Sequence, residues 1–101
     1  MPNVIGQWTT PTTTFTVTGA NFTEATKIYV SFRQNDYSFR VDDVTVVDNE
    51  NISISLSQAQ TGQFKEGKAQ AQINWVFDNN KRAMTYKCTI PIIDNLEDEE
   101  L

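Results

Sequence analysis

The sequence predicts an all-β protein, an immunoglobulin-like β-sandwich of about seven antiparallel strands with one short helical turn. Three observations indicate this class. Apolar and polar residues alternate with a period of two along most of the chain, turn-forming residues separate the alternating stretches at hairpin-scale spacing, and each stretch has one apolar face. Two sheets packed against each other bury such faces economically, and an open barrel is the alternative arrangement.

An opening strand and two hairpins are expected in the first half of the chain. The opening strand lies in "TTTFTVTG". Residues 27–41 alternate on both sides of an Asn35-Asp36 turn, and "VTVV" and "ISISLS" flank the turn formers 48–51. The inward-facing residues expected here are Phe15, Val17, Ile28, Val30, Phe32, Tyr37, Phe39, Val41, Ile52, Ile54 and Leu56.

A helical turn interrupts the strand pattern after Leu56. Ser57 is suited to cap a turn that begins at residues 58–61, and Gly62 is suited to end it in the left-handed backbone conformation. We expect Gly62 and Gly67 to hold turn conformations. Phe64 lies between them and is expected to fill one end of the sandwich.

Two further strands complete the expected domain. "AQAQINWVF" places Ala69, Ala71, Ile73, Trp75 and Phe77 on one face, and a turn at 78–81 leads into "RAMTYKCTIPI". We read the latter as one strand that ends near Pro91. Its expected inward residues are Met84, Tyr86, Cys88 and Ile90. The sandwich domain is therefore assigned to residues 1–93, and residues 94–101 are an acidic tail.

Composition limits the possible partners. The 101 residues carry a formal net charge of −5, which argues against binding to nucleic acid or to anionic lipid. The first residues, "MPNVIGQWTT", have neither a basic start nor a long apolar run, so we expect no membrane partner. A single cysteine fits a reducing compartment such as the cytoplasm.

Histidine, the residue most often used in acid–base catalysis, is absent. Its absence excludes Ser-His, Cys-His and imidazole–metal sites. Cys88 is interpreted as a core residue rather than a reactive thiol, because it shares the apolar row of its strand. Asp42 and Asp43 are interpreted as solvated turn charges rather than calcium ligands, since adjacent strand residues point to opposite faces. The sequence predicts no enzyme, no cofactor and no metal site.

The aromatic residues divide into core and surface candidates. Trp75 shares a row with Ile73 and Phe77, which indicates a core position rather than a sugar-binding platform. Tyr29 lies on the polar face of its strand and is the better surface candidate. Trp8 precedes the first expected strand, where it either caps one end of the core or anchors a partner.

The order of motifs extends over nearly the whole chain. In chain order these are Thr10-Pro11-Thr12 with Phe15, Leu56-Ser57-Gln58, the helical turn, Phe64, Lys65-Glu66-Gly67-Lys68, and a strand in which Gln70 and Gln72 alternate with apolar residues. In this order the sequence resembles a family of small proteins encoded among the virion-structure genes of phages and prophages, chiefly of Gram-positive hosts.

The resemblance implies a non-enzymatic structural or assembly protein. Its expected partners are other virion proteins, with a second copy of the chain as one candidate, first in the bacterial cytoplasm and then in the virion. A carbohydrate- or surface-binding module is the alternative, and a small enzyme ranks third. We expect contacts along an edge strand that begins at Pro11, and we expect deletion of residues 1–11 to leave the sandwich folded. The candidate interface residues are Trp8, Pro11, Thr12, Thr14 and Tyr29.

Overall fold

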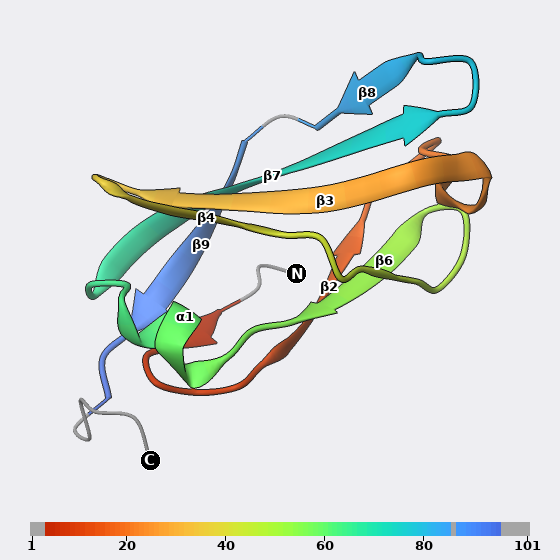
Figure 1. Cartoon of the computed structure of the whole chain (residues 1–101). Coiled ribbons are helices and arrows are strands. Elements are labelled where there is room, and N and C mark those ends of the chain that lie inside the picture. Colours follow the sequence, from red (N-terminus) through yellow and green to blue (C-terminus); the bar gives the residue numbers. More distant parts are fainter. Residues whose placement is uncertain (1–3, 86, 96–101) are drawn as a thin grey trace.

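The computed structural model describes residues 4–85 and 87–95. In these residues the chain forms nine strands, one turn of 3-10 helix and one short α-helix (Figure 1). In chain order the elements are β1 (Ile5–Gly6), β2 (Thr12–Thr16), η1 (Phe22–Glu24), β3 (Ala25–Gln34), β4 (Tyr37–Val41), β5 (Thr45–Val46), β6 (Asn51–Ser55), α1 (Gln58–Gly62), β7 (Gly67–Phe77), β8 (Arg82–Met84) and β9 (Cys88–Ile93).

Two sheets make up the sandwich, as Figure 1 shows. The large sheet has the order β1-β9-β7-β3-β4, with β8 also paired to β7, and the small sheet has the order β2-β6-β5. β9 pairs with the first part of β7 and β8 with the later part, so both lie on the side of β7 opposite β3. All these pairs are antiparallel except β1 with β9, where Ile5 pairs with Ile92 in parallel.

This strand order agrees with the immunoglobulin variable-type arrangement for seven strands, without counterparts of strands A and C″ among the described residues. The strands β2, β6 and β5 occupy the positions of strands B, E and D, while β9, β7, β3 and β4 occupy those of G, F, C and C′. The predicted all-β sandwich with a short helical turn is therefore confirmed. The description of its strands is corrected, because β1 and the separate β8 raise the expected seven to nine in the described residues, and one pair is parallel.

The apolar rows of both sheets meet in one core, as the alternation predicts. Most buried apolar residues come from β2, β3, β4, β6, β7 and β9, and the others come from β1, η1 and the connecting segments. Most of the residues named from the sequence are among them. Tyr37, Phe39, Val17 and Phe77 are partly buried and pack against this core. The core residues are Ile5, Phe15, Ala20, Phe22, Ile28, Val30, Phe32, Val41, Ile52, Ile54, Leu56, Phe64, Ala69, Ala71, Ile73, Trp75, Ile90 and Ile92.

Trp75 is a core residue, as its position in the apolar row predicts. Its ring packs edge-to-face on Phe22, with 5.0 Å between the ring centroids. Its indole Nε1 donates a hydrogen bond to the buried Ala20 carbonyl at 3.1 Å. A buried tryptophan needs a partner for its one polar atom, and this bond supplies it.

The helical turn has the predicted start but a different end. Ser57 caps α1: its Oγ accepts a hydrogen bond from Gln60 N at 3.1 Å, while Gln60 Oε1 accepts one from Ser57 N at 2.9 Å. The left-handed end predicted at Gly62 is wrong, because Gly62 is the last helical residue and Gln63 after it remains in the right-handed region. Gly67 does have a positive φ, of 134°.

The single strand expected over residues 82–92 is also corrected. β8 ends at Met84, and at the next residue a side chain replaces a backbone partner in the pairing with β7: Thr85 N donates to Ile73 O at 3.0 Å and Thr85 Oγ1 accepts from Ile73 N at 3.1 Å. Met84 is opposite Asn74 and 64% exposed, whereas Ala83 is opposite the core residue Trp75 and packs against the core. Tyr86, expected to face inward, lies outside the described residues.

The last strand runs further than predicted. β9 continues through Pro91 to Ile93. Ile92 pairs with Ile5 of β1, and its side chain is buried. Beyond it, Asn95 Nδ2 donates to the Gln7 carbonyl at 2.9 Å, which ties the start of the acidic segment to the β1 side. Residues 96–101 lie outside the described part of the chain.

Candidate functional site

The predicted interface residues lie on two separate surfaces. Trp8, Pro11, Thr12 and Thr14 lie in and before β2, which belongs to the small sheet. Tyr29 lies on β3 of the large sheet, on the face opposite the buried Ile28 and Val30. The structure therefore does not bring the five residues into one site, and each surface is described by itself.

β2 is an edge strand, as expected. It pairs with β6 on one side, and the order β2-β6-β5 leaves its other side at the margin of the small sheet. Pro11 O accepts a hydrogen bond from Leu56 N at 3.1 Å, and Val17 N donates one to Glu50 O at 2.7 Å. Because backbone groups alternate along an antiparallel strand, Thr12 and Thr16 direct theirs away from β6.

The segment before β2 is built into the domain. Ile5 is completely buried, Gln7 Nε2 donates to Phe64 O at 2.6 Å, and Thr61 Oγ1 donates to Thr9 O at 2.7 Å. Trp8 is half-buried, has a left-handed backbone with φ of 61°, and packs on Gly62. The burial of Ile5 argues against our prediction that residues 1–11 can be deleted without loss of folding, because the deletion would remove Ile5 from the core.

The outward face of the large sheet carries most of the positive charge of the chain. Six of the eight lysine and arginine residues lie on it, although the chain as a whole has a net charge of −5. We call this surface the cationic face. Its cations are Lys27, Arg33, Arg40, Lys68, Arg82 and Lys87.

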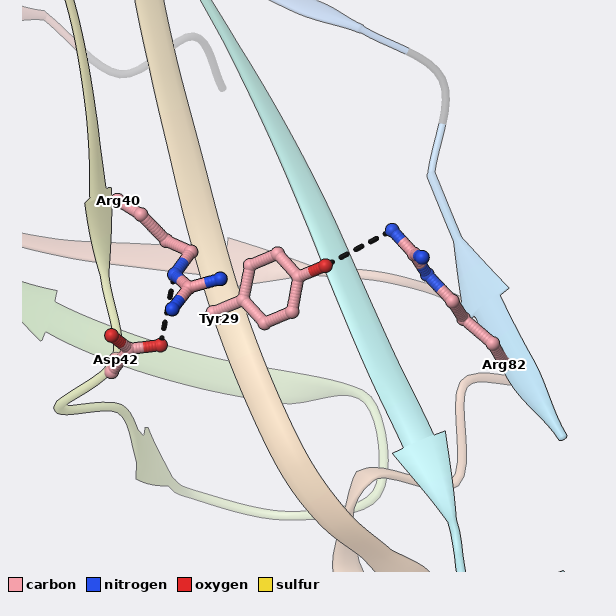
Figure 2. Close-up of polar contacts among 4 residues, drawn as sticks. All are labelled: Tyr29, Arg40, Asp42 and Arg82. Carbon is pink, nitrogen blue, oxygen red and sulfur yellow. Dashed lines mark hydrogen bonds and ion pairs between the residues drawn. The ribbon is translucent and has the colours of Figure 1, made fainter. Parts of the chain in front are cut away.

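Tyr29 is the centre of a cluster on the cationic face, with Arg40 of β4 and Arg82 of β8 on either side of it (Figure 2). Arg82 Nη2 donates to Tyr29 Oη at 3.0 Å, and the Arg40 Cζ lies 4.7 Å from the centroid of the tyrosine ring. The Lys27 ammonium lies 5.9 Å from the same centroid. The quadrupole of the ring attracts Lys27 and Arg40, whereas Arg82 is bound by its hydrogen bond to the hydroxyl, so all three cations contact Tyr29.

Each arginine of the cluster also contacts a second side chain, Asn74 for Arg82 and Asp42 for Arg40. Asn74 is buried, and its Oδ1 accepts from Arg82 Nε at 3.2 Å and from Arg82 Nη2 at 2.8 Å. Arg40 Nε pairs with Asp42 at 3.2 Å, although both side chains are about half exposed. Such contacts fix the orientation of a guanidinium group. The side chain therefore loses less conformational entropy when a partner binds it.

A shallow hollow lies beside the Tyr29 cluster. Polar side chains of β3, β4 and β7 line it, and Asn35 and Asp36 lie at the β3–β4 turn on its margin. These groups can donate and accept hydrogen bonds and attract negative charge, but they include no activated nucleophile. The polar lining residues are Ser31, Arg33, Ser38, Arg40, Gln70, Gln72 and Lys87.

Cys88 faces the interior beneath this sheet. It is half-buried, packs against the core, and its Sγ lies 3.3 Å from the Ala71 carbonyl, to which the thiol donates. Burial raises the pKa of the Cys88 thiol, which lowers the fraction of reactive thiolate at neutral pH. These contacts fit the interpretation of Cys88 as a core residue.

Sequence analysis identified Tyr29 but missed the cationic face around it. Lys27, Tyr29 and Arg33 share one parity on β3, so a pattern of outward basic residues was readable from the sequence. Arg82 joins Tyr29 only because β8 pairs with β7 in the observed register, where Arg82 is opposite Val76. The sequence contained no signal for that register.

Neither side-chain clusters suited to metal ions nor related proteins identify a function for the described part of the chain. The described part of the chain holds no group of three or more His, Cys, Asp or Glu residues placed to bind a metal ion. None of its helices is long and apolar enough to cross a membrane. Comparisons with protein-family models, with curated proteins and with solved structures gave no match.

Proposed function

We propose that this chain is a non-enzymatic structural or assembly protein of phage or prophage particles, present in the bacterial cytoplasm during assembly and then in the virion. It acts through contacts with other virion proteins, among which a second copy is one candidate. The resemblance in motif order supports the setting. The edge position of β2 in the small sheet, among the strands of the described residues, is the observation that supports the kind of contact.

The edge of β2 has the chemistry of a strand that accepts another strand. Its five residues, TTTFT, carry no charge, whereas solvent-exposed edges are commonly protected by charged residues. Pro11 precedes it, at a position where only its carbonyl is used in pairing with Leu56. Addition of a strand from a partner would engage the backbone groups of Thr12 and Thr16 that point away from β6.

The test is a proline at Thr12. Thr12→Pro removes one outward N–H and no backbone hydrogen bond to β6. Thr12→Val is the matched control, because both variants lose the contact of the Thr12 hydroxyl with Ser55 and only valine keeps the N–H. Both variants should unfold at nearly the wild-type temperature. We expect the proline variant to be lost from purified particles, measured by mass spectrometry, and the valine variant to be retained. Equal incorporation of both variants would contradict contact through β2.

The hollow on the cationic face favours one alternative function. Its amides and hydroxyls, from Gln70, Gln72, Ser31 and Ser38, are groups that bind sugar hydroxyls. Under this alternative the chain is a carbohydrate- or surface-binding module. Saturable binding of a polysaccharide from the host cell wall, lost in Gln72→Ala, would favour it over a role in assembly.

A further inference from the structure

The charges of this protein are separated between its surfaces. Among the described residues the one ion pair is Arg40–Asp42, so the other five cations of the cationic face have no carboxylate partner there. Asp36 and Asp42 both lie at the β4 margin of the face, at the start and the end of that strand. A concentrated positive surface creates a local field that attracts an anionic partner, even on a protein with a net charge of −5.

The guanidinium groups of Arg40 and Arg82 are held in place by an ion pair and by hydrogen bonds that use only some of their N–H donors. Arg40 engages Asp42 through Nε, and Arg82 engages Asn74 and Tyr29 through Nε and Nη2. Within the described residues, no hydrogen bond uses Arg82 Nη1 or the two Nη atoms of Arg40. A guanidinium held in this way presents its remaining N–H groups in a fork that matches a carboxylate.

The same chain carries a segment of matching chemistry. Residues 94–101, "DNLEDEEL", contain five carboxylates in eight residues. Asp94 is exposed, and Asn95 is anchored to Gln7 through hydrogen bonds of 2.9 and 3.3 Å. The segment therefore starts at the β1 margin of the large sheet, outside the cationic face.

We propose that the cationic face binds residues 94–101 of a second copy of this chain. Reach favours a second copy over the chain's own segment. The six residues after Asn95 span at most about 20 Å when fully extended. Lys68 and Arg82, which is opposite Val76, are separated by eight residues of β7, or about 26 Å. The segment of a second copy is not tethered at the β1 margin of this sheet, so it can lie against any part of the row of cations, including the part around Arg82.

This contact joins two different surfaces, so it is heterologous and repeats from copy to copy. Such contacts generate closed rings or open filaments, according to the rotation between neighbours. The inference goes beyond the proposed contact through β2, because it concerns the opposite sheet and depends on different residues. Loss of one contact is therefore distinguishable from loss of the other.

The experiment is a charge reversal on the full chain, followed by sedimentation velocity at low and high salt. Arg33→Glu with Lys87→Glu reverses two cations of the face. Lys65→Glu with Lys81→Glu is the matched control, since it makes the same change of net charge with the two cations that lie elsewhere. Circular dichroism melts confirm that every variant is folded.

We expect the wild-type chain to self-associate at low salt and to dissociate toward 1 M NaCl, where the Debye length is about 3 Å and charges farther apart are screened. The face variant should weaken association at least about tenfold, because like charges then meet across the contact, and the control should resemble wild type. Adding Glu97→Lys and Glu99→Lys to the face variant restores the net charge of −5 and should restore association.

Three results would overturn the inference. The first is a wild-type chain that stays monomeric at every salt and protein concentration. Binding of single-stranded DNA to this face by such a monomeric chain would count as the same result. The second is a face variant that associates as well as the control. The third is a doubly reversed chain that is folded but remains monomeric. The Thr12→Pro variant should associate normally through the cationic face, which separates this test from that of the β2 contact.

Discussion

The indole ring of Trp8 lies directly on the backbone of Gly62. A Cβ added to Gly62 would be 2.2 Å from Trp8 Cε3 and 2.4 Å from Cδ2 and Cζ3. Contacts on either side of Trp8 hold this arrangement, because Gln7 bonds to the Phe64 carbonyl and Thr61 bonds to the Thr9 carbonyl. The glycine is therefore required for space beneath an aromatic ring, and not for a left-handed backbone.

Gly62→Ala should destabilise the protein by about 1–3 kcal/mol, the usual cost of forcing extra atoms into a packed site. The added methyl group displaces Trp8 and with it the bonds that fasten residues 7–9 to α1. Urea unfolding followed by tryptophan fluorescence measures the change. A variant as stable as wild type would contradict the close contact.

The control for this prediction is the same substitution without the ring. In a Trp8→Ala background, Gly62→Ala should be neutral or stabilising by up to about 1 kcal/mol, because alanine is the better helix former. The change of sign between the two backgrounds is the expected signature. Equal destabilisation in both would point to backbone strain at Gly62 instead.

Phe64→Ala should cost about 3–5 kcal/mol, as expected for a large buried aromatic side chain. Phe64 is 1% exposed and contacts the rings of Tyr37, Phe39 and Phe32, with centroid distances of 5.4, 5.7 and 6.3 Å. The midpoint of urea unfolding measures the cost. Val47→Ala is the control, because Val47 is 60% exposed and its truncation should change the midpoint little. A Phe64 variant no less stable than this control would contradict the conclusion that Phe64 fills the end of the sandwich next to α1.

Much of the fold was predictable because its signals are local. The period of two along β3, β6 and β7 identified their buried rows, and Ser57 with Gln60 three residues later is a local capping signal. β1 was missed because two residues give no periodicity, and its parallel partner Ile92 lies far away in the sequence. The break at Thr85 was missed for a related reason, since a threonine hydroxyl that substitutes for a backbone partner leaves no pattern.

The candidate site was predictable only in part. Tyr29 and the edge position of β2 followed from residue type and alternation. The cluster around Tyr29 depends on registers that place Arg40 and Arg82 beside it from two other strands. Gly62 shows the same limit, because its role depends on Trp8, which is distant in sequence. Contacts between distant segments therefore decided what local patterns left open.

Cys88 should react slowly in the native protein. Its half-buried thiol donates to the Ala71 carbonyl, and burial raises its pKa, so little thiolate is present at neutral pH. Labelling with a thiol reagent at pH 7 should be slower than in 6 M guanidinium, and Cys88→Ala should cost about 1 kcal/mol. Because the folded pKa is the higher one, stability should fall as pH rises above about 8.5, and Cys88→Ala should lack that part of the fall. Native labelling as fast as denatured labelling would contradict burial.

Asp48 should make stability depend on pH at the acid end. Hydrogen bonds from Glu50 N at 2.8 Å and from Asn51 Nδ2 at 2.9 and 3.0 Å lower the pKa of its exposed carboxyl. The unfolded chain then binds the proton more readily than the folded chain. Stabilisation by Asp48 is therefore complete above its ordinary pKa, about 3.9, and is lost as the pH falls through the lower folded value.

The measurement compares the free energy of unfolding of wild type and Asp48→Asn between pH 2 and 6. Wild type should be the more stable near pH 6, and the difference should shrink steadily below pH 4, because a protonated carboxyl and an amide both lack the charge that these donors favour. Asp43→Asn controls for the loss of one negative charge at an exposed position nearby. A difference between wild type and Asp48→Asn that stays constant across this range, or grows toward acid, would contradict a role for the carboxylate in holding the β5–β6 turn.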